Sequence, residues 1–252
     1  LVLVPDGTYT NDNTPRLSGT AEAGSLVTIY DGNVVLGSTT ANADGEWVFL
    51  SPVLTDGQHT LTATVTDSLG NVSAPSSSFT VQVDATPPQP VSAVLLQNDN
   101  DPDNLVTIAN GGATNDNTPL LSGSGEPGGL VNVYNGNVLV GSATVDSEGN
   151  WSLNTSPLDN GNYTLTVVVS DNAGNVSDPV SIGVTVNTVG PDPVLSFEVN
   201  ANNGPTALPL VDGSFTNDTT PVLSGTAQAG AIINLLQDDT VIGSVVADAN
   251  GV

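Results

Sequence analysis

Apolar and polar residues alternate along many short stretches of this chain. Leu61, Ala63 and Val65 are separated by threonines, and residues 79–83 and 165–169 follow the same period of two. Successive side chains of a β-strand point to opposite faces of a sheet, so each stretch would have one buried face and one solvated face, as in antiparallel sheets. Because valine and threonine dominate the apolar stretches and no long run of helix-forming residues occurs, the pattern predicts an all-β fold.

One block of sequence occurs three times. Thr-Asn-Asp-Asn-Thr-Pro occupies residues 10–15 and 114–119, and Thr-Asn-Asp-Thr-Thr-Pro occupies residues 216–221; each copy is followed, one residue later, by Leu-Ser-Gly. The copies are 104 and 102 residues apart. A period near 100 residues is too long for one unit of a solenoid and matches a whole β-sandwich domain.

The period predicts three tandem immunoglobulin-like antiparallel β-sandwiches, at residues 1–85, 86–188 and 189–252, with about seven strands each. Measured against the second repeat, the first lacks its beginning and the third lacks its last three strands, so the second is expected to be the complete one. Trp47 and Trp151 begin the fifth strand of their repeats and are expected to anchor the cores. In the first repeat the strands are expected at residues 1–4, 16–20, 25–30, 33–40, 46–50, 58–66 and 76–83.

Residues 158–165, Leu-Asp-Asn-Gly-Asn-Tyr-Thr-Leu, resemble a tyrosine corner, in which a tyrosine hydroxyl bonds to the backbone a few residues upstream. Tyr163 would be the corner tyrosine. The first repeat has His59 at the matching position, and His59 is the single histidine of the chain. We expect His59 to replace the corner tyrosine rather than to act in catalysis.

The charge of the chain is strongly one-sided. A single basic residue, Arg16, stands against 26 aspartates and glutamates, which gives a formal net charge of −25. Nucleic acid and anionic lipid are therefore excluded as partners, because both are held by clusters of lysine and arginine. No segment approaches the ~20 consecutive apolar residues of a membrane span, so no membrane insertion is expected. Cysteine is absent, and mutual repulsion of the carboxylates makes Ca²⁺ the expected counter-charge in place of disulfide bonds.

Chain direction places three turns of each sandwich at the same end, where the preceding linker arrives. At the junction of the first and second repeats, carboxylates from four segments are expected to converge and to bind Ca²⁺ through their oxygens. These carboxylates belong to Asp84, Glu126, Asp146, Glu148 and Asp171. The alternative is that each aspartate caps its own turn through local hydrogen bonds, which suits Asp171 and its counterpart Asp67.

Matching acidic positions elsewhere are weaker metal candidates. In the first repeat, where no incoming linker is present, they are Glu22, Asp44, Glu46 and Asp67. At the next junction Asn187 and Gln228 replace two of the acidic residues, while Asp192 and Asp248 remain. Full Ca²⁺ occupancy is therefore not expected at the second junction.

A separate acidic loop covers residues 98–104. Asp99 and Asp101 alternate with asparagine there as at the start of a calcium-binding loop, but Pro102 interrupts the pattern and the glycine and distant glutamate of an EF-hand are absent. A solvated loop between two short strands is an equal alternative. At the opposite end of each sandwich the aspartates of the repeated block are expected to fix a turn, and Asp56 and Asp159 could join a metal site beside them.

The inventory of reactive side chains argues against an enzyme. The chain has no cysteine and no lysine, and its second and third repeats have no histidine. A pair of carboxylates of the kind used by glycosidases is not excluded by counting, but the two tryptophans are assigned to the cores and no aromatic-lined cleft is indicated. We therefore expect no catalytic site.

The second repeat has four motifs in a fixed order: the Asn-Asp-Asn-Thr-Pro block, a Glu-Pro-Gly turn, a Glu-Gly-Asn-Trp turn and an Asp-Asn-Ala-Gly-Asn-Val-Ser turn. The first repeat has the same or a related sequence at each matching position. In this combination the chain resembles the bacterial immunoglobulin-like tandem repeats of giant type I-secreted adhesins and biofilm-associated surface proteins. The resemblance implies an elongated, monomeric rod of domains, secreted to the bacterial cell surface, often with Ca²⁺ between the domains.

The function that this resemblance implies is structural: a Ca²⁺-stiffened stalk that extends a distal binding region and supports cell adhesion. Its partners would be the adjacent repeats, with a host glycan or protein bound by other regions. Two alternatives stay open. The repeats themselves could bind a host glycan or protein, through Tyr30 and Tyr134 beside matching turns, or could mediate homophilic adhesion through the edges of the sandwiches.

Overall fold

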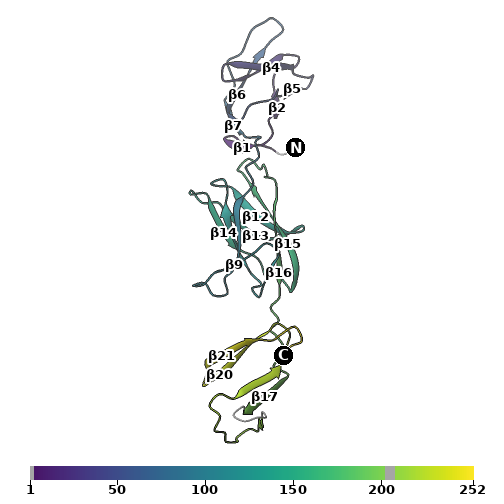
Figure 1. The fold of residues 1–252 in the computed structure, drawn as a ribbon. Helices are drawn as coiled ribbons and strands as arrows, with labels where there is room; N and C mark the ends of the chain where they lie inside the picture. The colour runs from purple at the N-terminus through teal and green to yellow at the C-terminus, as the bar shows by residue number, and fades with distance from the viewer. Residues whose placement is uncertain (1–2, 202–207) are drawn as a thin grey trace. The chain divides into compact units, whose positions relative to one another are not determined.

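The computed structural model describes residues 3–201 and 208–252, and these residues form strands, turns and loops (Figure 1). The expected all-β fold is confirmed. No helix in the described residues is long and apolar enough to cross a membrane. The chain divides into two compact units, residues 1–188 and residues 189–252, and the first unit contains two repeats.

The second repeat is a sandwich of two sheets. Its strands are β8 (Ser92–Asn98), β9 (Val106–Ile108), β10 (Gly112–Thr114), β11 (Leu120–Ser124), β12 (Leu130–Asn135), β13 (Val138–Thr144), β14 (Asn150–Asn154), β15 (Gly161–Ser170) and β16 (Val180–Val186). Five strands form one sheet in the order β10-β16-β15-β12-β13, and four form the other in the order β14-β11-β8-β9. All neighbours are antiparallel except β10 and β16.

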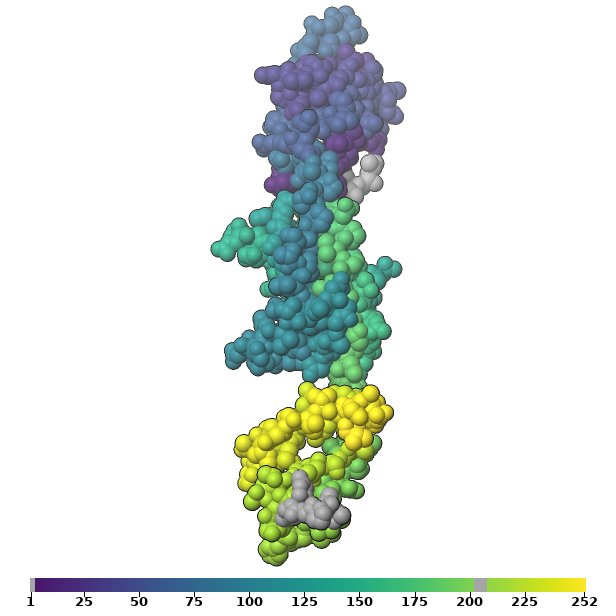
Figure 2. All heavy atoms as spheres, in the orientation of Figure 1, coloured from purple at the N-terminus to yellow at the C-terminus, as the bar shows by residue number. Residues whose placement is uncertain are grey.

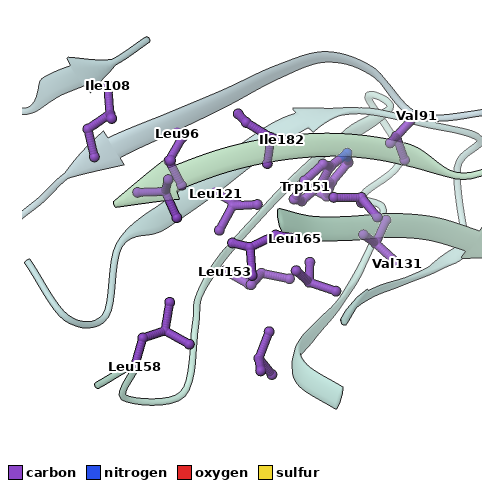
Figure 3. Close-up of a cluster of buried hydrophobic side chains, with 14 of the residues drawn as sticks. Val91, Leu96, Ile108, Leu121, Val131, Trp151, Leu153, Leu158, Leu165 and Ile182 are labelled. Carbon is purple, nitrogen blue, oxygen red and sulfur yellow. The ribbon is translucent and has the colours of Figure 1, made fainter. Parts of the chain in front are cut away.

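The core of the second repeat lies between its two sheets (Figure 3). Leu121 of the four-stranded sheet and Val131 and Leu165 of the five-stranded sheet are fully buried, and Trp151 is 4% exposed. Burial of each such side chain contributes about 1.5–3 kcal/mol. Trp151 therefore anchors this core, as the sequence predicts.

The first repeat follows the same plan with fewer strands in its second sheet. Its strands are β1 (Thr8–Thr10), β2 (Arg16–Thr20), β3 (Leu26–Asp31), β4 (Val34–Thr40), β5 (Glu46–Leu50), β6 (Gly57–Thr66) and β7 (Phe79–Val83). One sheet has the order β1-β7-β6-β3-β4, and in the described part of the chain the other consists of β2 and β5. Trp47 of β5 is half-buried, because its sheet has two strands where the sheet of Trp151 has four. Trp47, which the sequence predicts to be a core anchor, is therefore only partly buried in the core.

The expected strand at residues 1–4 is not found. Residues 1–2 lie outside the described residues, and Leu3 and Val4 are not in a strand. The first strand is instead β1, which pairs in parallel with β7, and β10 pairs with β16 in the same way. Hydrophobic alternation does not reveal β1 or β10, because three residues are too few to show a period.

The residues that the structure describes between 189 and 252 form five strands in two small sheets. They are β17 (Ser196–Ala201), β18 (Leu208–Leu210), β19 (Val222–Thr226), β20 (Ile232–Gln237) and β21 (Thr240–Val246). The sheets have the orders β18-β17-β19 and β20-β21. The pairing of β17 with β18 and β19 repeats that of β8 with β9 and β11, and β20 pairs with β21 as β12 pairs with β13.

The glycine of the Leu-Ser-Gly motif is explained by the tryptophan packed on it. A Cβ atom on Gly19 would lie 2.7 Å from the Trp47 ring, and one on Gly123 would lie 2.9 Å from the Trp151 ring. Both separations are well below van der Waals contact between carbon atoms, which is about 3.5–4.0 Å. In the first two repeats the motif therefore leaves room for the tryptophan that covers it.

Candidate functional site

Aspartates cap the turns at the end of the second repeat that receives the linker. In the turn between β15 and β16, Asp171 Oδ1 accepts hydrogen bonds from the N–H groups of Ala173 and Asn175, each at 2.9 Å. Asp171 Oδ2 accepts a third bond from the side-chain amide of Asn175 at 2.7 Å. Between β13 and β14, Asp146 Oδ1 accepts bonds from two N–H groups of its own turn, at 2.9 and 2.8 Å. Both aspartates therefore stabilise their own turns.

The first repeat has the same turn chemistry. Asp67 Oδ1 accepts bonds from the N–H groups of Leu69 and Asn71 at 2.9 and 2.8 Å, and Asp67 Oδ2 accepts one from the Asn71 side chain at 2.7 Å. The bond from the Asn71 side chain, followed by that from its backbone, lowers the pKa of Asp67 below 3.8. In the turn before β5, Asn42 accepts the two capping bonds, at 2.9 Å each, so this turn is capped without a charge.

The expected convergence of carboxylates at the junction is not found. Among the described residues, no three histidine, aspartate or glutamate side chains form a group that could hold a metal ion. The candidates that this finding covers are Asp84, Glu126, Asp146, Glu148, Asp171, Glu22, Asp44, Glu46, Asp67, Asp99 and Asp101. Asp67, Asp146 and Asp171 accept bonds from nearby N–H groups, because local bonds form without bringing distant segments together, and the glutamates are exposed. The described residues thus do not form a Ca²⁺ site with its ligands already assembled, and calcium binding stays a prediction.

The acidic loop of residues 98–104 joins β8 to β9. Asp99 Oδ2 accepts a bond from the Asn154 side chain at 2.7 Å, and Asp101 Oδ1 accepts one from the Asp103 N–H at 3.2 Å. Each carboxylate thus acts singly, and residues 100–105 are exposed. The loop therefore has the features of a solvated loop between two short strands, which was the alternative to a metal site.

The aspartates of the repeated block each cap a turn, and in the first two repeats this turn follows the parallel strands β1 and β10. Asp12, Asp116 and Asp218 each accept a bond from the N–H group two residues ahead, at 2.9, 2.8 and 2.9 Å. Asp116 is 1% exposed and also accepts a bond from the Asp99 N–H at 3.1 Å. Each of these aspartates fixes a turn, as the sequence predicts.

The linker between the first and second repeats is bonded from both sides. On the side of the first repeat, the Asp84 N–H donates to the Thr10 carbonyl at 2.9 Å. The Asp56 carboxylate accepts bonds from the Ala85 N–H at 2.8 Å and from the hydroxyl of the residue after it. On the side of the second repeat, the Asp84 carbonyl accepts a bond from the Asn175 side-chain amide at 2.8 Å. Asp84 is therefore bonded through its backbone to both repeats.

Asn175 makes this connection because its amide nitrogen carries two hydrogens. One bond goes to Asp171 Oδ2 in the same turn and the other to the Asp84 carbonyl in the linker, and Asn175 is buried. In the first repeat the counterpart, Asn71, is exposed and bonds to Asp67. The turn between β15 and β16 thus forms its own structure and also holds the incoming linker.

The linker that leaves the second repeat begins with matching bonds. The Asn187 N–H donates to the Thr114 carbonyl at 2.9 Å, as Asp84 does to Thr10. Asn160 Oδ1 accepts bonds from the Thr188 N–H at 2.9 Å and from the Thr188 hydroxyl at 3.0 Å. Asn160 therefore binds the outgoing linker as Asp56 binds the first linker, but through an uncharged amide.

Hydrogen bonds to the linker stabilise the charged form of Asp56. The bond from the Ala85 N–H, followed by that from the Thr86 hydroxyl, lowers the pKa of Asp56 below 3.8. The prediction that Asp56 and Asp159 join a metal site is not supported by their contacts. The Asp56 carboxylate holds the linker, and Asp159 contributes its backbone carbonyl to the corner of the second repeat.

The two repeats close their corners with different side chains. The Tyr163 hydroxyl donates to the Asp159 carbonyl at 2.9 Å, which confirms the tyrosine corner. His59 Nε2 lies 2.8 Å from the Thr55 carbonyl, four residues upstream as in the tyrosine corner, so His59 does replace the tyrosine. His59 has a second partner, because its Nδ1 lies 2.6 Å from Asp31 Oδ2.

Sequence reasoning missed the residues that hold the linkers and the partner of His59. Asp56 and Asn160 stand directly before the glycine that begins β6 and β15, and this shared position is a signal that comparison of the repeats could have used. Asp31 and Asn135 likewise occupy matching positions at the ends of β3 and β12. For Asn175 the repeat gives no such signal, because Asn71 is identical and does not show a bond to a linker.

The two repeats of the first unit are similar to domains of known proteins. A family model described as a bacterial Ig-like domain matches residues 5–85 and 96–188, which is more than half of the chain. Bacillopeptidase F of Bacillus subtilis (strain 168) is 34% identical over 170 residues, which cover 68% of this chain and 10% of that protein. The chain thus spans about a tenth of the length of this relative.

Solved structures of similar fold include the fibronectin(III)-like modules of Clostridium thermocellum CbhA, with 18% identity, a TM-score of 0.41 and coverage of 72% of this chain and 90% of that one. A BSP domain of a biofilm associated protein has 20% identity, a TM-score of 0.28 and coverage of 73% and 29%. The family match rests on both repeats of the first unit, each of which has its own sandwich. The chain belongs to the bacterial Ig-like domain family.

Proposed function

We propose that this chain is a spacer segment of a larger secreted protein at a bacterial surface, in which tandem domains hold a binding region away from the cell. The observation that carries the proposal is the bonded linker between the first and second repeats. Asp84 is joined through its N–H to Thr10 of one repeat and through its carbonyl to Asn175 of the next. Bonds of this kind restrict the motion that an unattached linker would allow.

Repetition of the linker bonds supports a structural role. The Asp56 carboxylate holds the start of the first linker, and the Asn160 amide holds the start of the second through the same N–H position. A spacer needs the same device at each joint, whereas a binding site would be expected in one repeat. Tyr30 and Tyr134, which could have marked such a site, are both half-buried within their sheets.

Stiffening by Ca²⁺ is a finer part of the proposal. A formal net charge of −25 makes compact packing of the domains costly through self-repulsion, and a divalent cation would lower this cost. The described residues offer no assembled ligand set, so the effect would come from loosely held ions or from a rearranged joint. Comparing CaCl₂ with NaCl of equal ionic strength separates specific binding from screening.

Small-angle scattering of the whole chain tests the spacer role. Asn175→Ala removes the bond to the linker and should broaden the distribution of interatomic distances, because the second repeat is released from Asp84. Asn71→Ala is the matched control, since Asn71 caps a turn but is exposed, and it should leave the distribution unchanged. Identical curves for the two variants would remove the basis of the proposal.

The calcium part has its own readout. If specific Ca²⁺ binding stiffens the chain, CaCl₂ should raise the maximum dimension and the melting temperature above their values in NaCl at matched ionic strength. Chelator should then reverse both changes. Equal values in the two salts would eliminate calcium stiffening and leave the hydrogen-bonded joint untouched.

A further inference from the structure

The corner of the first repeat contains an ionisable pair that the second repeat lacks. The ring of His59 faces two oxygens, the Thr55 carbonyl at Nε2 and the Asp31 carboxylate at Nδ1. A carbonyl and an ionised carboxylate can only accept hydrogen bonds, and a neutral imidazole has one N–H, so both bonds form only when the ring is protonated. The second repeat has Asn135 and Tyr163 at these positions, so an amide and a phenol hydroxyl replace the carboxylate and the imidazole.

The surroundings of His59 favour the protonated ring. Asp31 faces it from β3, and from β7 its partner is the uncharged Val81. The segment before β6 presents the Thr55 carbonyl, and the nearby Asp56 carboxylate bonds to the linker. Burial lowers the pKa of His59, but the bonds to Thr55 and Asp31 and the charge of Asp31 together outweigh it, so the pKa lies above 6.5.

The sign of the effect on stability follows from this direction. A histidine whose pKa is raised by folding stabilises the folded state in full below its ordinary pKa, about 6.5, and loses that contribution as the pH rises through the raised pKa. The corner of the first repeat is therefore held most firmly on the acidic side of neutrality. When the ring loses its proton, one of its two bonds must be lost. The charged Asp31 carboxylate holds the remaining N–H more strongly than the Thr55 carbonyl does, so the bond to Thr55 is the one that is lost.

The corner is directly connected to the linker. Thr55, whose carbonyl bonds to His59, precedes Asp56, whose carboxylate holds the Ala85 N–H. The residue before Ala85 is Asp84, the one bonded to both repeats. A shift of the segment at Thr55 would therefore move the carboxylate that positions the start of the linker.

We propose that His59 is a pH-sensitive latch of the joint between the first and second repeats: the protonated ring fixes the Thr55–Asp56 segment, Asp56 then holds the linker, and loss of the proton loosens both. The joint becomes less ordered as the pH rises, while the linker that leaves the second repeat does not respond. This inference rests on the proposed role of the joint. Its test observes the hydrogen bonds themselves, so it can fail while the spacer role stands.

Nuclear magnetic resonance of the whole chain provides the test. His59 is the only histidine, so its ring signals give one unambiguous titration. Amide hydrogen exchange is followed at Ala85 and at Thr188, whose N–H is held in the same way by Asn160 and serves as a control in the same molecule. Taking the ratio of protection at Ala85 to that at Thr188 cancels the general acceleration of exchange by base.

In the natural sequence this ratio should fall about fivefold as His59 loses its proton, which is the size expected for one hydrogen bond. Asp31→Asn combined with His59→Tyr copies the corner of the second repeat and should make the ratio independent of pH. The reciprocal change, Asn135→Asp with Tyr163→His, should transfer the pH dependence to Thr188.

Two results would overturn the proposal. One is a constant ratio in the natural sequence across the titration of His59, which would show a corner without influence on the linker. The other is an equal fall in the ratio for the Asp31→Asn, His59→Tyr variant, which would assign the effect to another group. The first result is decisive even if that variant fails to fold.

Discussion

The second repeat and residues 189–252 share their motifs but differ in their interiors. Asp116 and Asp218 accept the same capping bond, and Asp146 and Asp248 cap the same later turn. The matching leucines differ sharply: Leu121 is fully buried, whereas Leu223 is 38% exposed. Turns therefore form from local bonds, whether or not a closed core lies behind them.

The difference comes from the number of strands that cover each apolar face. In the second repeat β12 lies between β13 and β15, and Val131 and Val133 are fully buried. Among the described residues of the C-terminal unit, β20 pairs only with β21. A hollow of about 520 Å³ lies between the two small sheets (Figure 2). The hollow is lined by apolar side chains including Phe197, Leu223 and Leu235. The core of the second repeat is thus closed because more strands cover each of its apolar faces.

Leucine truncation should show the largest contrast between these regions. Leu121→Ala removes a side chain that is enclosed on all sides and should destabilise the second repeat by about 2–5 kcal/mol. Leu223→Ala should cost less than about 1 kcal/mol in the C-terminal unit, because a partly exposed side chain leaves little cavity. Amide exchange resolved by residue measures both in the whole chain. Equal costs would mean that the two interiors are alike.

Adding one methyl group should lower the free energy of unfolding by about 1–3 kcal/mol more in the second repeat than in the C-terminal unit. A Cβ on Gly141 would lie 2.6 Å from Leu153 Cδ1, so Gly141→Ala should force the core of the second repeat to shift. The matched change, Gly243→Ala, meets nothing within 4 Å and should be tolerated. Amide exchange in β12 and β14 reports on the first variant, and amide exchange in β20 and β21 reports on the second. The comparison fails if Gly243→Ala is the more damaging.

Removal of the corner hydroxyl should have a smaller effect. Tyr163→Phe loses the bond to the Asp159 carbonyl, and we expect a loss of about 1 kcal/mol from the second repeat that does not change with the protonation of His59. In the first repeat, Asp31→Asn should lower the pKa of His59 and move the decline in stability to lower pH, since the charge of Asp31 favours the protonated ring. Thermal denaturation against pH measures both. A pH-dependent loss in Tyr163→Phe would contradict the contrast between the corners.

Acid should produce the smallest effect, confined to one linker. The pKa of Asp56 is lowered by its bonds to Ala85 and Thr86, so its contribution is present above pH 3.8 and is lost as the pH falls through the lowered pKa. Protection of the Ala85 N–H should therefore decline in acid, while that of Thr188, held by the uncharged Asn160, should not. Asp56→Asn should make Ala85 behave like Thr188. An acid response at Thr188 of equal size would show that another group is responsible.

Local pattern was sufficient for most strands of the first repeat. The expected strands at residues 16–20 and 46–50 match β2 and β5 to the residue. Both are bounded by turns whose capping bonds depend on residues close in sequence, and both alternate between half-buried and exposed positions. The parallel strands β1 and β10 were not predicted, because their place is set by pairing with β7 and β16, which are about 70 residues away in sequence.

The junction shows where local pattern fails. Chain direction correctly brings the Asp171 turn to the linker, but it cannot tell which atoms meet there. The contact is made by the Asn175 side chain and the Asp84 carbonyl, 91 residues apart, and not by the two carboxylates. The same limit explains why Trp47 and Trp151, at matching positions of their repeats, differ in burial.

The sequence by itself determined the repeat, the alternating strands and the capped turns, since each depends on side-chain order and on hydrogen bonds within a few residues. Tertiary structure decided which repeat has a closed core, which of the two partners of His59 is charged and which groups hold the linker. These features depend on groups brought together from distant strands. The aspartates in the turns accept hydrogen bonds from the nearest N–H groups and do not converge on one another.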